Sequence, residues 1–303
     1  MNDLEGRVAL ITGAASGIGL GLARTFAAAH MRVALADVRA DVLDAATRTL
    51  AAGGASVLAL ELDVTDRAAW ASLPDRIERE LGPVRLLASN AGVNFVGATQ
   101  EATYEDWDFC LGVNLGGAIN AVHTFVPRMI AQGPPGHIII TSSVSGLFTN
   151  GGAGVYATSK FALTGLAESL SADLARHGIG VSVLCPGPVK SDLFESTIAV
   201  RPAALAATGS VPVTPAGVMR ADTPIFATAM TPDEVGRCAL RAVRRNDLYV
   251  MTHPEIHSML QARTDALLAA LPNSPIDPRR IEATRGLLDP SLYAAQAAKP
   301  PPD

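Results

Sequence analysis

The stretch that decides the fold is RVALITGAASGIG, residues 7–19 of a chain of 303 residues. Its first six residues are apolar or β-branched after the arginine, which is typical of a strand with both faces buried. Three glycines follow within eight residues, where the chain must turn tightly from that strand into a helix. The N-terminus of such a helix offers free N–H groups and a partial positive charge, which together bind phosphate. A tight turn alone also uses glycine, so later motifs must support this interpretation.

Six further apolar runs alternate with longer stretches of helical periodicity. They are RVALAD (32–37), SVLALEL (56–62), VRLLASN (84–90), HIIITSS (137–143), GVSVLCP (180–186) and DLYVMT (247–252). Strands that alternate with helices form right-handed βαβ units and a parallel sheet. We therefore expect an α/β fold, a doubly wound parallel sheet (Rossmann fold) of about seven strands with helices on both faces.

We expect one domain over residues 1–303. Residues 190–232 are rich in Pro, Ala and Thr with few charges, which is typical of a variable substrate loop. Residues 255–297 are expected to form a C-terminal helical extension. Its first helix is marked by Ile256, Met259, Leu260, Arg263, Leu267, Leu268 and Leu271, and its second runs through Ile281, Leu287, Leu288 and Leu292.

Composition and charge exclude several classes of function. Apolar residues make up 49% of the chain and charged residues 17%, so a disordered chain is excluded. A net charge of −5 argues against a nucleic-acid partner. The three cysteines have no C-x-x-C spacing, so we expect no disulfide framework, no metal site and a reducing compartment. With no signal peptide and no long uninterrupted apolar run, we expect a cytoplasmic protein without a membrane partner.

Tyr156 and Lys160 stand four positions apart, so both side chains lie on one face of a helix. A tyrosine with a pKa of about 10 is a poor base at neutral pH, and a neighbouring ammonium group lowers that pKa because it favours the phenolate. A shift of about 3 units corresponds to about 4 kcal/mol, which a close, partly buried charge can supply. The pair therefore predicts an acid/base group. The alternative is a chance spacing of a tyrosine and a surface lysine.

Asp37 ends the second predicted strand, 18 positions beyond Gly19. An acidic side chain there can accept hydrogen bonds from the ribose hydroxyls of an adenine dinucleotide; the alternative is a helix N-cap. A carboxylate about 4 Å from a 2′-phosphate opposes it by roughly 4 kcal/mol per charge pair at a dielectric near ~20. Asp37 therefore favours NAD over NADP, although Arg39 could pair with a phosphate and soften that preference.

The other motifs follow the strands in order. They are Asp63, NAG (90–92), Ser143 and PG (186–187) after successive strands, with Asn114 and YATSK (156–160) in helices. The carboxyl ends of the strands of a doubly wound sheet are where ligands bind. This set of motifs, over roughly residues 5–255, resembles the short-chain dehydrogenase/reductase family.

The resemblance implies a catalytic tetrad of Asn114, Ser143, Tyr156 and Lys160. Ser143 is chosen among nearby serines because the family keeps its serine 13 positions before the tyrosine, and 156 − 143 = 13. The implied reaction moves a hydride between NAD and a secondary alcohol or ketone. Tyr156 would take the alcohol proton and Ser143 would hydrogen-bond the same oxygen. Lys160 would hold the nicotinamide ribose, and Asn114 would organise a water chain.

The resemblance also implies which residues bind the dinucleotide. Asp63 and Val64 would contact adenine, and Val189 would meet the carboxamide, while Ser191 stands where the family usually has threonine. The full predicted set is Gly13, Ser16, Gly17, Ile18, Gly19, Asp37, Val38, Asp63, Val64, Asn90, Ala91, Gly92, Tyr156, Lys160, Pro186, Gly187, Val189 and Ser191.

Three segments resemble more closely the aryl-alcohol branch of the family, which oxidises benzylic Cα hydroxyls of lignin-derived diaryl ethers. They are ADVRAD (36–41), GVNLGGAINAVHTFVPRMIAQGPPGHI (112–138) and RPA (201–203). A bulky, largely hydrophobic alcohol or ketone also suits the apolar residues of the variable loop. Candidate pocket walls, each of which could equally be core, are Phe95, Phe194, Ile198, Val218, Met219, Ile225 and Phe226. The predicted substrate-binding set is Ser143, Tyr156, Phe95, Phe194, Met219 and Phe226.

Two other functions remain open from the sequence. One is an NADPH-dependent ketone reductase, which Asp37 disfavours and Arg39 keeps open. The other is a non-catalytic NAD-binding scaffold or sensor, which would be free to lose the tetrad. The family's helices around Asn114 and Tyr156 commonly form subunit interfaces, so the resemblance implies a homodimer or homotetramer. His253 and His257 are interpreted as surface residues near the rim of the pocket.

Overall fold

The computed structural model of the chain describes residues 1, 3–149, 151–205, 227–285 and 289–302. The chain forms two compact units, Met1–His253 and Pro254–Asp303. The single domain expected over the whole chain stays a prediction. The predicted positions outside the described residues are Val218, Met219, Ile225, Phe226, Leu287 and Leu288.

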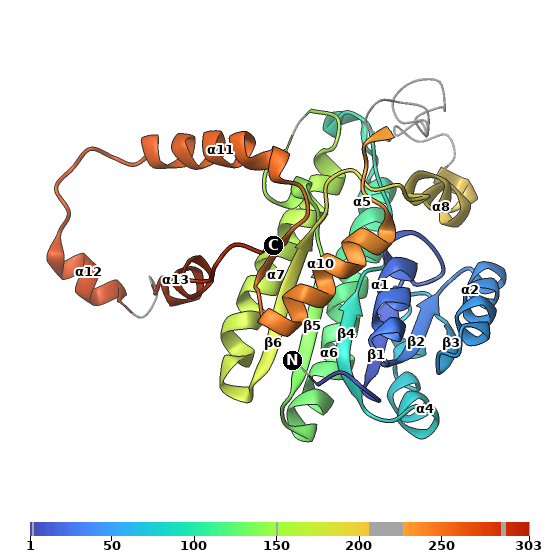
Figure 1. The fold of residues 1–303 in the computed structure, drawn as a ribbon. Coiled ribbons are helices and arrows are strands. Elements are labelled where there is room, and N and C mark those ends of the chain that lie inside the picture. Colours follow the sequence, from blue (N-terminus) through green and yellow to red (C-terminus); the bar gives the residue numbers. More distant parts are fainter. Residues whose placement is uncertain (2, 150, 206–226, 286–288, 303) are drawn as a thin grey trace. The chain divides into compact units, whose positions relative to one another are not determined.

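The first unit is built on one sheet of seven parallel strands in the order β3-β2-β1-β4-β5-β6-β7, which confirms the predicted fold class. Figure 1 shows the strands from β6 on the left to β3 on the right, with α1 and α10 in front. The strands are β1 (Val8–Thr12), β2 (Arg32–Asp37), β3 (Val57–Glu61), β4 (Val84–Ser89), β5 (Gly136–Thr141), β6 (Ile179–Cys185) and β7 (Tyr249–Met251). Each predicted strand forms, with bounds shifted by no more than two residues.

Helices cover both faces because alternate residues of each strand point to opposite sides of the sheet. In β1, Val8 and Leu10 belong to one apolar core, and Ala9 and Ile11 belong to a second one. Helices α3, α4, α6 and α7 pack in the first core, whereas α1, α2 and α10 pack in the second. The helices of this unit are α1 (Gly17–Ala28), α2 (Ala40–Ala52), α3 (Arg67–Trp70), α4 (Leu73–Glu80), α5 (Tyr104–Leu111), α6 (Gly117–Gln132), α7 (Gly154–Leu174), α8 (Leu193–Val200) and α10 (Pro232–Arg245).

Helix α7 carries the YATSK motif in its first two turns. A short 3-10 turn, Ala175–His177, continues it, and Gly178 then adopts a left-handed conformation with φ 64°. Gly178 thus ends the helix, since a residue without Cβ adopts this conformation at low cost.

The strand order changes direction beside β1. The chain moves from β1 outward to β2 and β3, and then returns to the other side of β1 for β4. Loops on the two sides of such a point diverge and leave a crevice at the carboxyl ends of the strands. The predicted motifs follow these ends, so the topology brings them to one edge of the sheet.

Helices α5 and α6 and the π-helical turn between them run as one stretch, Tyr104–Gln132. Length and composition alone would let this stretch cross a membrane. However, 44% of its most apolar window is buried in the protein, and Ala121, Phe125 and Met129 belong to the first core. Core helices of soluble proteins share these properties, so the stretch is weak support for a membrane span.

The second unit contains α11 (His257–Ala269), α12 (Pro278–Thr284) and α13 (Ser291–Ala297). The first predicted helix of the extension forms. The prediction of one second helix through residues 281–292 is wrong, because α12 ends at Thr284 and α13 begins after Pro290. Proline disfavours helical backbone in the residue before it and cannot donate a helical hydrogen bond, so a helix does not run through Asp289 and Pro290.

Candidate active site

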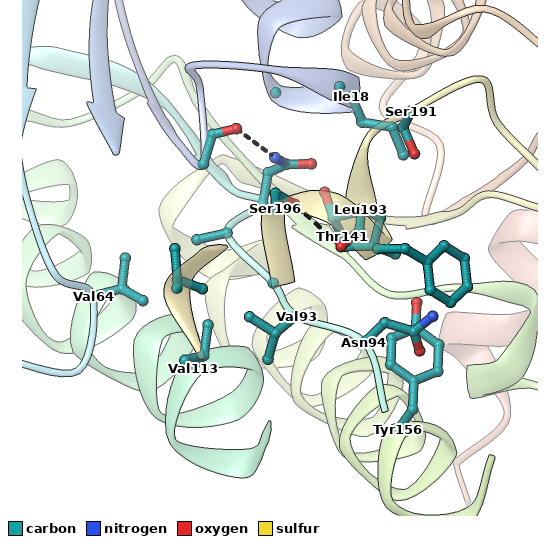
Figure 2. Close-up of a pocket in the computed structure, with 18 of the residues that line it drawn as sticks. Ile18, Val64, Val93, Asn94, Val113, Thr141, Tyr156, Ser191, Leu193 and Ser196 are labelled. Carbon is teal, nitrogen blue, oxygen red and sulfur yellow. Dashed lines mark hydrogen bonds between the residues drawn. The ribbon is translucent and has the colours of Figure 1, made fainter. Parts of the chain in front are cut away.

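A cavity of about 1010 Å³ lies at the carboxyl ends of the strands. All the residues predicted to bind the dinucleotide line it, and so do Ser143 and Phe194. Figure 2 shows Ile18 and Ser191 toward the top of the cavity, Tyr156 and Asn94 at the lower right, and Val64 and Val113 on the left. The fold therefore gathers side chains from distant parts of the sequence around one space, large enough for a dinucleotide and a second molecule.

The loop between β1 and α1 requires glycine for two different reasons. Gly13 and Gly17 have φ values of 64° and 50°, which residues that carry a side chain rarely adopt. At Gly19 a Cβ would lie 2.0 Å from the carbonyl oxygen of Gly13, so no side chain fits between the helix and the loop. The N-cap residue, Ser16, makes no side-chain cap bond to the first turn of α1. The first N–H groups of the helix are thus left for an anion, and the cradle fits a phosphate.

Asp37 ends β2 beside this loop, with a side chain only 5% exposed. Its carboxylate accepts hydrogen bonds from the Ala15 N–H at 3.1 Å and the Arg39 N–H at 3.0 Å. The N-cap position of α2 is Arg39, so the alternative role of Asp37 as that N-cap is wrong. The Asp37 carboxylate is held at the wall of the cavity, where a ribose could reach it.

The Arg39 guanidinium lies between two carboxylates. Its Nε donates to Asp37 at 3.3 Å, and its Nη1 donates to Asp192 at 3.5 Å. A third bond, from Nη2 to the Ser16 hydroxyl at 2.7 Å, ties it to the phosphate loop. Two nearby negative charges offset the attraction of this arginine for a phosphate.

The NAG motif locks the end of β4 to the glycine loop. The Asn90 amide donates to the carbonyl oxygens of Thr12 at 3.1 Å and Gly13 at 3.4 Å. Two residues on, a Cβ at Gly92 would lie 3.3 Å from Asn114 Oδ1 and 3.6 Å from Lys160 Nζ. The motif thus connects the predicted phosphate site with the predicted catalytic groups.

Ser143, Tyr156 and Lys160 all line the cavity. The Ser143 side chain hydrogen-bonds the Tyr156 hydroxyl. Lys160 Nζ lies 5.4 Å from the centroid of the Tyr156 ring and donates to the carbonyl oxygen of Thr141 at 3.1 Å. Two hydroxyls and one amine therefore converge where a reacting oxygen could bind.

The pKa of Tyr156 is not lowered, so the prediction that Lys160 makes it a ready base is wrong for the chain by itself. Burial raises the pKa of Tyr156 to about 12, and the bond to Ser143 only partly offsets this. Burial also lowers the pKa of Lys160 to about 8. The sequence could give the spacing of the two groups but not their burial, which is the largest cause of both pKa shifts.

Asn114 lies in the π-helical turn Gly112–Gly116 and does not line the cavity. Its Oδ1 accepts from the Val93 N–H at 2.7 Å, while its Nδ2 donates to the Val93 carbonyl at 3.0 Å and to Ser159 Oγ at 2.9 Å. Ser159 in turn donates to the Tyr156 carbonyl at 2.7 Å. The Asn114 side chain therefore holds the chain after β4 against α7, and its predicted water chain stays a prediction. Sequence reasoning missed Ser159, a polar residue inside the YATSK motif.

The comparison with known families agrees with this geometry. The profile of the family described as short chain dehydrogenase matches residues 7–201. The chain belongs to the short-chain dehydrogenase family. Members of this family are oxidoreductases, so the predicted family and the coarse reaction class are confirmed.

Relatives of this short-chain dehydrogenase include the C alpha-dehydrogenase of Sphingobium sp. (strain NBRC 103272 / SYK-6), 36% identical over 288 residues and covering 93% of each chain. A solved short-chain dehydrogenase from Novosphingobium aromaticivorans is 34% identical with a TM-score of 0.82, over 99% of this chain and 100% of its own. A short-chain dehydrogenase/reductase from Burkholderia phymatum, solved in complex with NAD, is 31% identical with a TM-score of 0.80, over 91% and 100%. The predicted likeness to the C alpha-dehydrogenase branch is confirmed.

The substrate end of this dehydrogenase differs in part from the prediction. Phe194 lines the cavity as expected. Phe95 does not, although residues 94 and 96 on either side of it do. It is 2% exposed and packs in a small core with Val93, Cys110 and Val155. Ile198 is 53% exposed and does not line the cavity either.

Helix α5 supplies a wall that the sequence did not reveal. Glu105, Asp108, Phe109, Gly112 and Val113 line the cavity at the three- and four-residue spacing of one helix face.

Among the described residues, no group of three or more His, Cys, Asp or Glu side chains is placed to hold a metal ion.

A buried ion pair joins this wall to Arg201, within the predicted variable loop. The Arg201 guanidinium donates to the Asp106 carboxylate, and the two side chains are 9% and 0% exposed. Arg201 also donates to the Leu205 carbonyl at 3.2 Å, and its guanidinium carbon lies 5.9 Å from the centre of the Phe109 ring. Since Phe109 and Leu205 line the cavity, the RPA segment shapes the substrate end through this arginine.

Arg201→Met is expected to raise the KM for a bulky alcohol about tenfold and to cost stability of about 3–5 kcal/mol, because it removes the arginine charge that faces the buried Asp106 carboxylate. Denaturant titration and steady-state kinetics measure the two effects. The control is Arg76→Met, which removes a surface ion pair with Glu80 and should change neither by much. An unchanged KM and midpoint in Arg201→Met would contradict this role.

Proposed function

We propose that the chain is an NAD-dependent alcohol dehydrogenase that oxidises a secondary alcohol to a ketone, with Tyr156 as the acid/base group. One observation carries the proposal. The hydrogen-bonded Tyr156 and Ser143 hydroxyls line the same cavity as the glycine loop and the Asp37 carboxylate. A reacting alcohol and a nicotinamide dinucleotide would therefore share one space.

The residues present fit the cofactor. The glycine loop would hold the pyrophosphate, Asp37 the adenosine ribose, and Asp63 and Val64 the adenine. Residues 186–191 would hold the nicotinamide end. When bound, oxidised NAD supplies the hydride acceptor. Arg39, engaged by Asp37 and Asp192, supports NAD over NADP and weighs against an NADPH-dependent ketone reductase.

The chain's own residues would move the proton. Tyr156 Oη accepts the proton of the alcohol hydroxyl, and Ser143 Oγ hydrogen-bonds the same oxygen as its charge changes. The Lys160 Nζ lies 5.4 Å from the centre of the Tyr156 ring, on the same wall of the cavity, where it would hold the nicotinamide ribose. Asn114 holds Val93 and Ser159 in place beneath these groups.

The substrate we propose is a bulky hydrophobic or aromatic alcohol, including benzylic ones. Apolar side chains support this proposal, because Phe109, Leu193, Phe194, Val200 and Leu205 all line the cavity. The similarity to a C alpha-dehydrogenase supports it as well. We also propose a cytoplasmic homodimer or homotetramer, in line with the helices that the family commonly uses as interfaces.

The test is a screen of aryl and alicyclic secondary alcohols in which the absorbance of reduced cofactor is followed with NAD and NADP in parallel. We expect turnover with NAD and an aryl alcohol. Turnover only with NADP would favour the ketone reductase, and tight NAD binding without turnover of any alcohol would favour a scaffold or sensor.

Alcohol oxidation is expected to accelerate with pH, because only the phenolate of Tyr156 accepts a proton and a pKa of about 12 leaves little of it at neutral pH. Each pH unit raises the phenolate fraction about tenfold until Lys160, with a pKa of about 8, loses its charge. The logarithm of kcat/KM should thus climb with a slope near ~1 and level off above that value. Ketone reduction needs protonated Tyr156 and should stay flat over the same range.

Steady-state rates across this range measure the profile. Lys160→Arg is the control, since an arginine stays charged and removes the break near pH 8. A flat oxidation profile below the break would contradict Tyr156 as the base.

A further inference from the structure

The segment after β6 forms the cavity wall at the predicted nicotinamide end. Pro186, Gly187, Pro188 and Val189 all line the cavity. None of these four residues carries a charged side chain. What fixes this backbone therefore decides the shape of the wall.

His253, the last residue of the first unit, contacts this backbone. The Gly187 N–H donates to His253 Nδ1 at 3.2 Å, and His253 Nε2 lies 3.1 Å from the Pro188 carbonyl oxygen. Neighbouring Thr252 places its hydroxyl 2.6 Å from the same Nδ1 and 3.3 Å from the Gly187 nitrogen. Two successive peptide groups of the wall are thus bound to one imidazole.

The ring also packs directly on the backbone. A Cβ at Gly187 would lie 2.8 Å from His253 Cγ and 2.8 Å from its Nδ1. Such contacts do not occur in folded proteins, so residue 187 cannot carry a side chain while the ring is there. The glycine of the PG motif is required here by the approach of His253.

The hydrogen bonds indicate which imidazole nitrogen accepts and which one can donate. Because the Gly187 N–H can only donate, Nδ1 must be the acceptor. The proton then lies on Nε2, which can donate to the Pro188 carbonyl. In this arrangement one imidazole hydrogen-bonds two successive peptide groups of the wall.

A second anchor, Met230, binds the same segment through its backbone. The Met230 N–H donates to the Pro188 carbonyl at 3.2 Å, and the Lys190 N–H donates to the Met230 carbonyl at 2.8 Å. Loss of His253 would leave the Gly187 N–H with the Thr252 hydroxyl and the Pro188 carbonyl with the Met230 N–H. A partial effect on the wall, rather than collapse of the fold, is the expected result.

We propose that His253 is a positioning residue that fixes the Gly187 and Pro188 backbone and so shapes the wall that receives the nicotinamide end of the cofactor. The proposal rests on the proposed function, since it assumes that this cavity binds NAD. It changes the interpretation of His253 from a surface residue to a part of the cofactor site.

The test compares NAD with ADP-ribose, which lacks the nicotinamide ring, by calorimetric titration of the full chain. His253→Phe keeps an aromatic ring at this position and removes both hydrogen-bonding nitrogens. It should weaken NAD binding about tenfold, while ADP-ribose binding should change less than about twofold. His253→Asn offers an amide oxygen near the place of Nδ1 and should recover part of the loss. His177→Phe, at the end of the turn that follows α7, is the matched control and should bind both ligands like the wild type.

Each other outcome counts against the proposal. Equal NAD binding by His253→Phe and the wild type would overturn it. A parallel loss of NAD and ADP-ribose would overturn it too, since that result indicates a general structural role. If His253→Phe does not fold, His253→Asn decides by the same ratio of the two ligands. A wild type that binds ADP-ribose but not NAD would overturn both this proposal and the proposed function.

Discussion

Tyr156→Phe is expected to lower turnover about 10³-fold, because it removes the group that exchanges a proton with the reacting oxygen. NAD binding should stay nearly unchanged, since the ring remains and the hydroxyl bonds Ser143 rather than the glycine loop. Steady-state kinetics and a separate NAD titration measure the two quantities.

Tyr249→Phe is the matched control for this result. It also removes a tyrosine hydroxyl and a hydrogen bond, here to Glu168 at 2.6 Å, but Tyr249 does not line the cavity. Its turnover should stay within a few-fold of the wild type. Tyr156→Phe with wild-type turnover would show that another group moves the proton.

Asp37→Asn is expected to shift the ratio of kcat/KM for NAD to kcat/KM for NADP by roughly 10³ toward NADP, the factor that corresponds to about 4 kcal/mol of repulsion between the carboxylate and a 2′-phosphate. The change also releases Arg39 from one of its two carboxylates. Parallel kinetics with the two cofactors measure the shift.

Asp192→Asn is the control for the cofactor switch. It removes the other carboxylate that contacts Arg39, at 3.5 Å, while leaving the one predicted to face the ribose. The ratio should change much less than in Asp37→Asn. Should the two variants shift the ratio equally, the preference would depend on the state of Arg39 and not on repulsion by Asp37.

The fold was predictable because its signals are local. The inner strands β1, β4, β5 and β6 are buried on both faces and read as largely apolar runs, and the glycine loop is read from eight consecutive residues. The tetrad spacing was equally readable, since Tyr156 and Lys160 share one helix. The structure adds that Ser143, Tyr156 and Lys160 line one cavity, whereas Asn114 does not.

The rest depends on contacts between distant residues. The Arg201–Asp106 pair joins positions 95 residues apart, and His253 meets Gly187 from 66 residues away. No spacing rule predicts either contact. Phe95 was misplaced because its aromatic character suits a pocket wall and a core equally, and only the direction of the chain at that point separates the two.

The pKa of Tyr156 could not be predicted from the neighbouring lysine. The sequence gives the attraction between phenolate and ammonium, whereas the burial that raises the pKa to about 12 comes from the packed fold. A low phenolate fraction in the free chain still permits catalysis, provided that binding brings further positive charge to the site.

The central claim is that hydride passes from a carbinol carbon to NAD in this cavity. The most direct measurement uses a benzylic secondary alcohol deuterated at that carbon, with mass spectrometry of the reduced cofactor and the product. The account predicts one deuterium in each reduced cofactor and an equal amount of ketone. Ketone formed with no deuterium in the cofactor would contradict it.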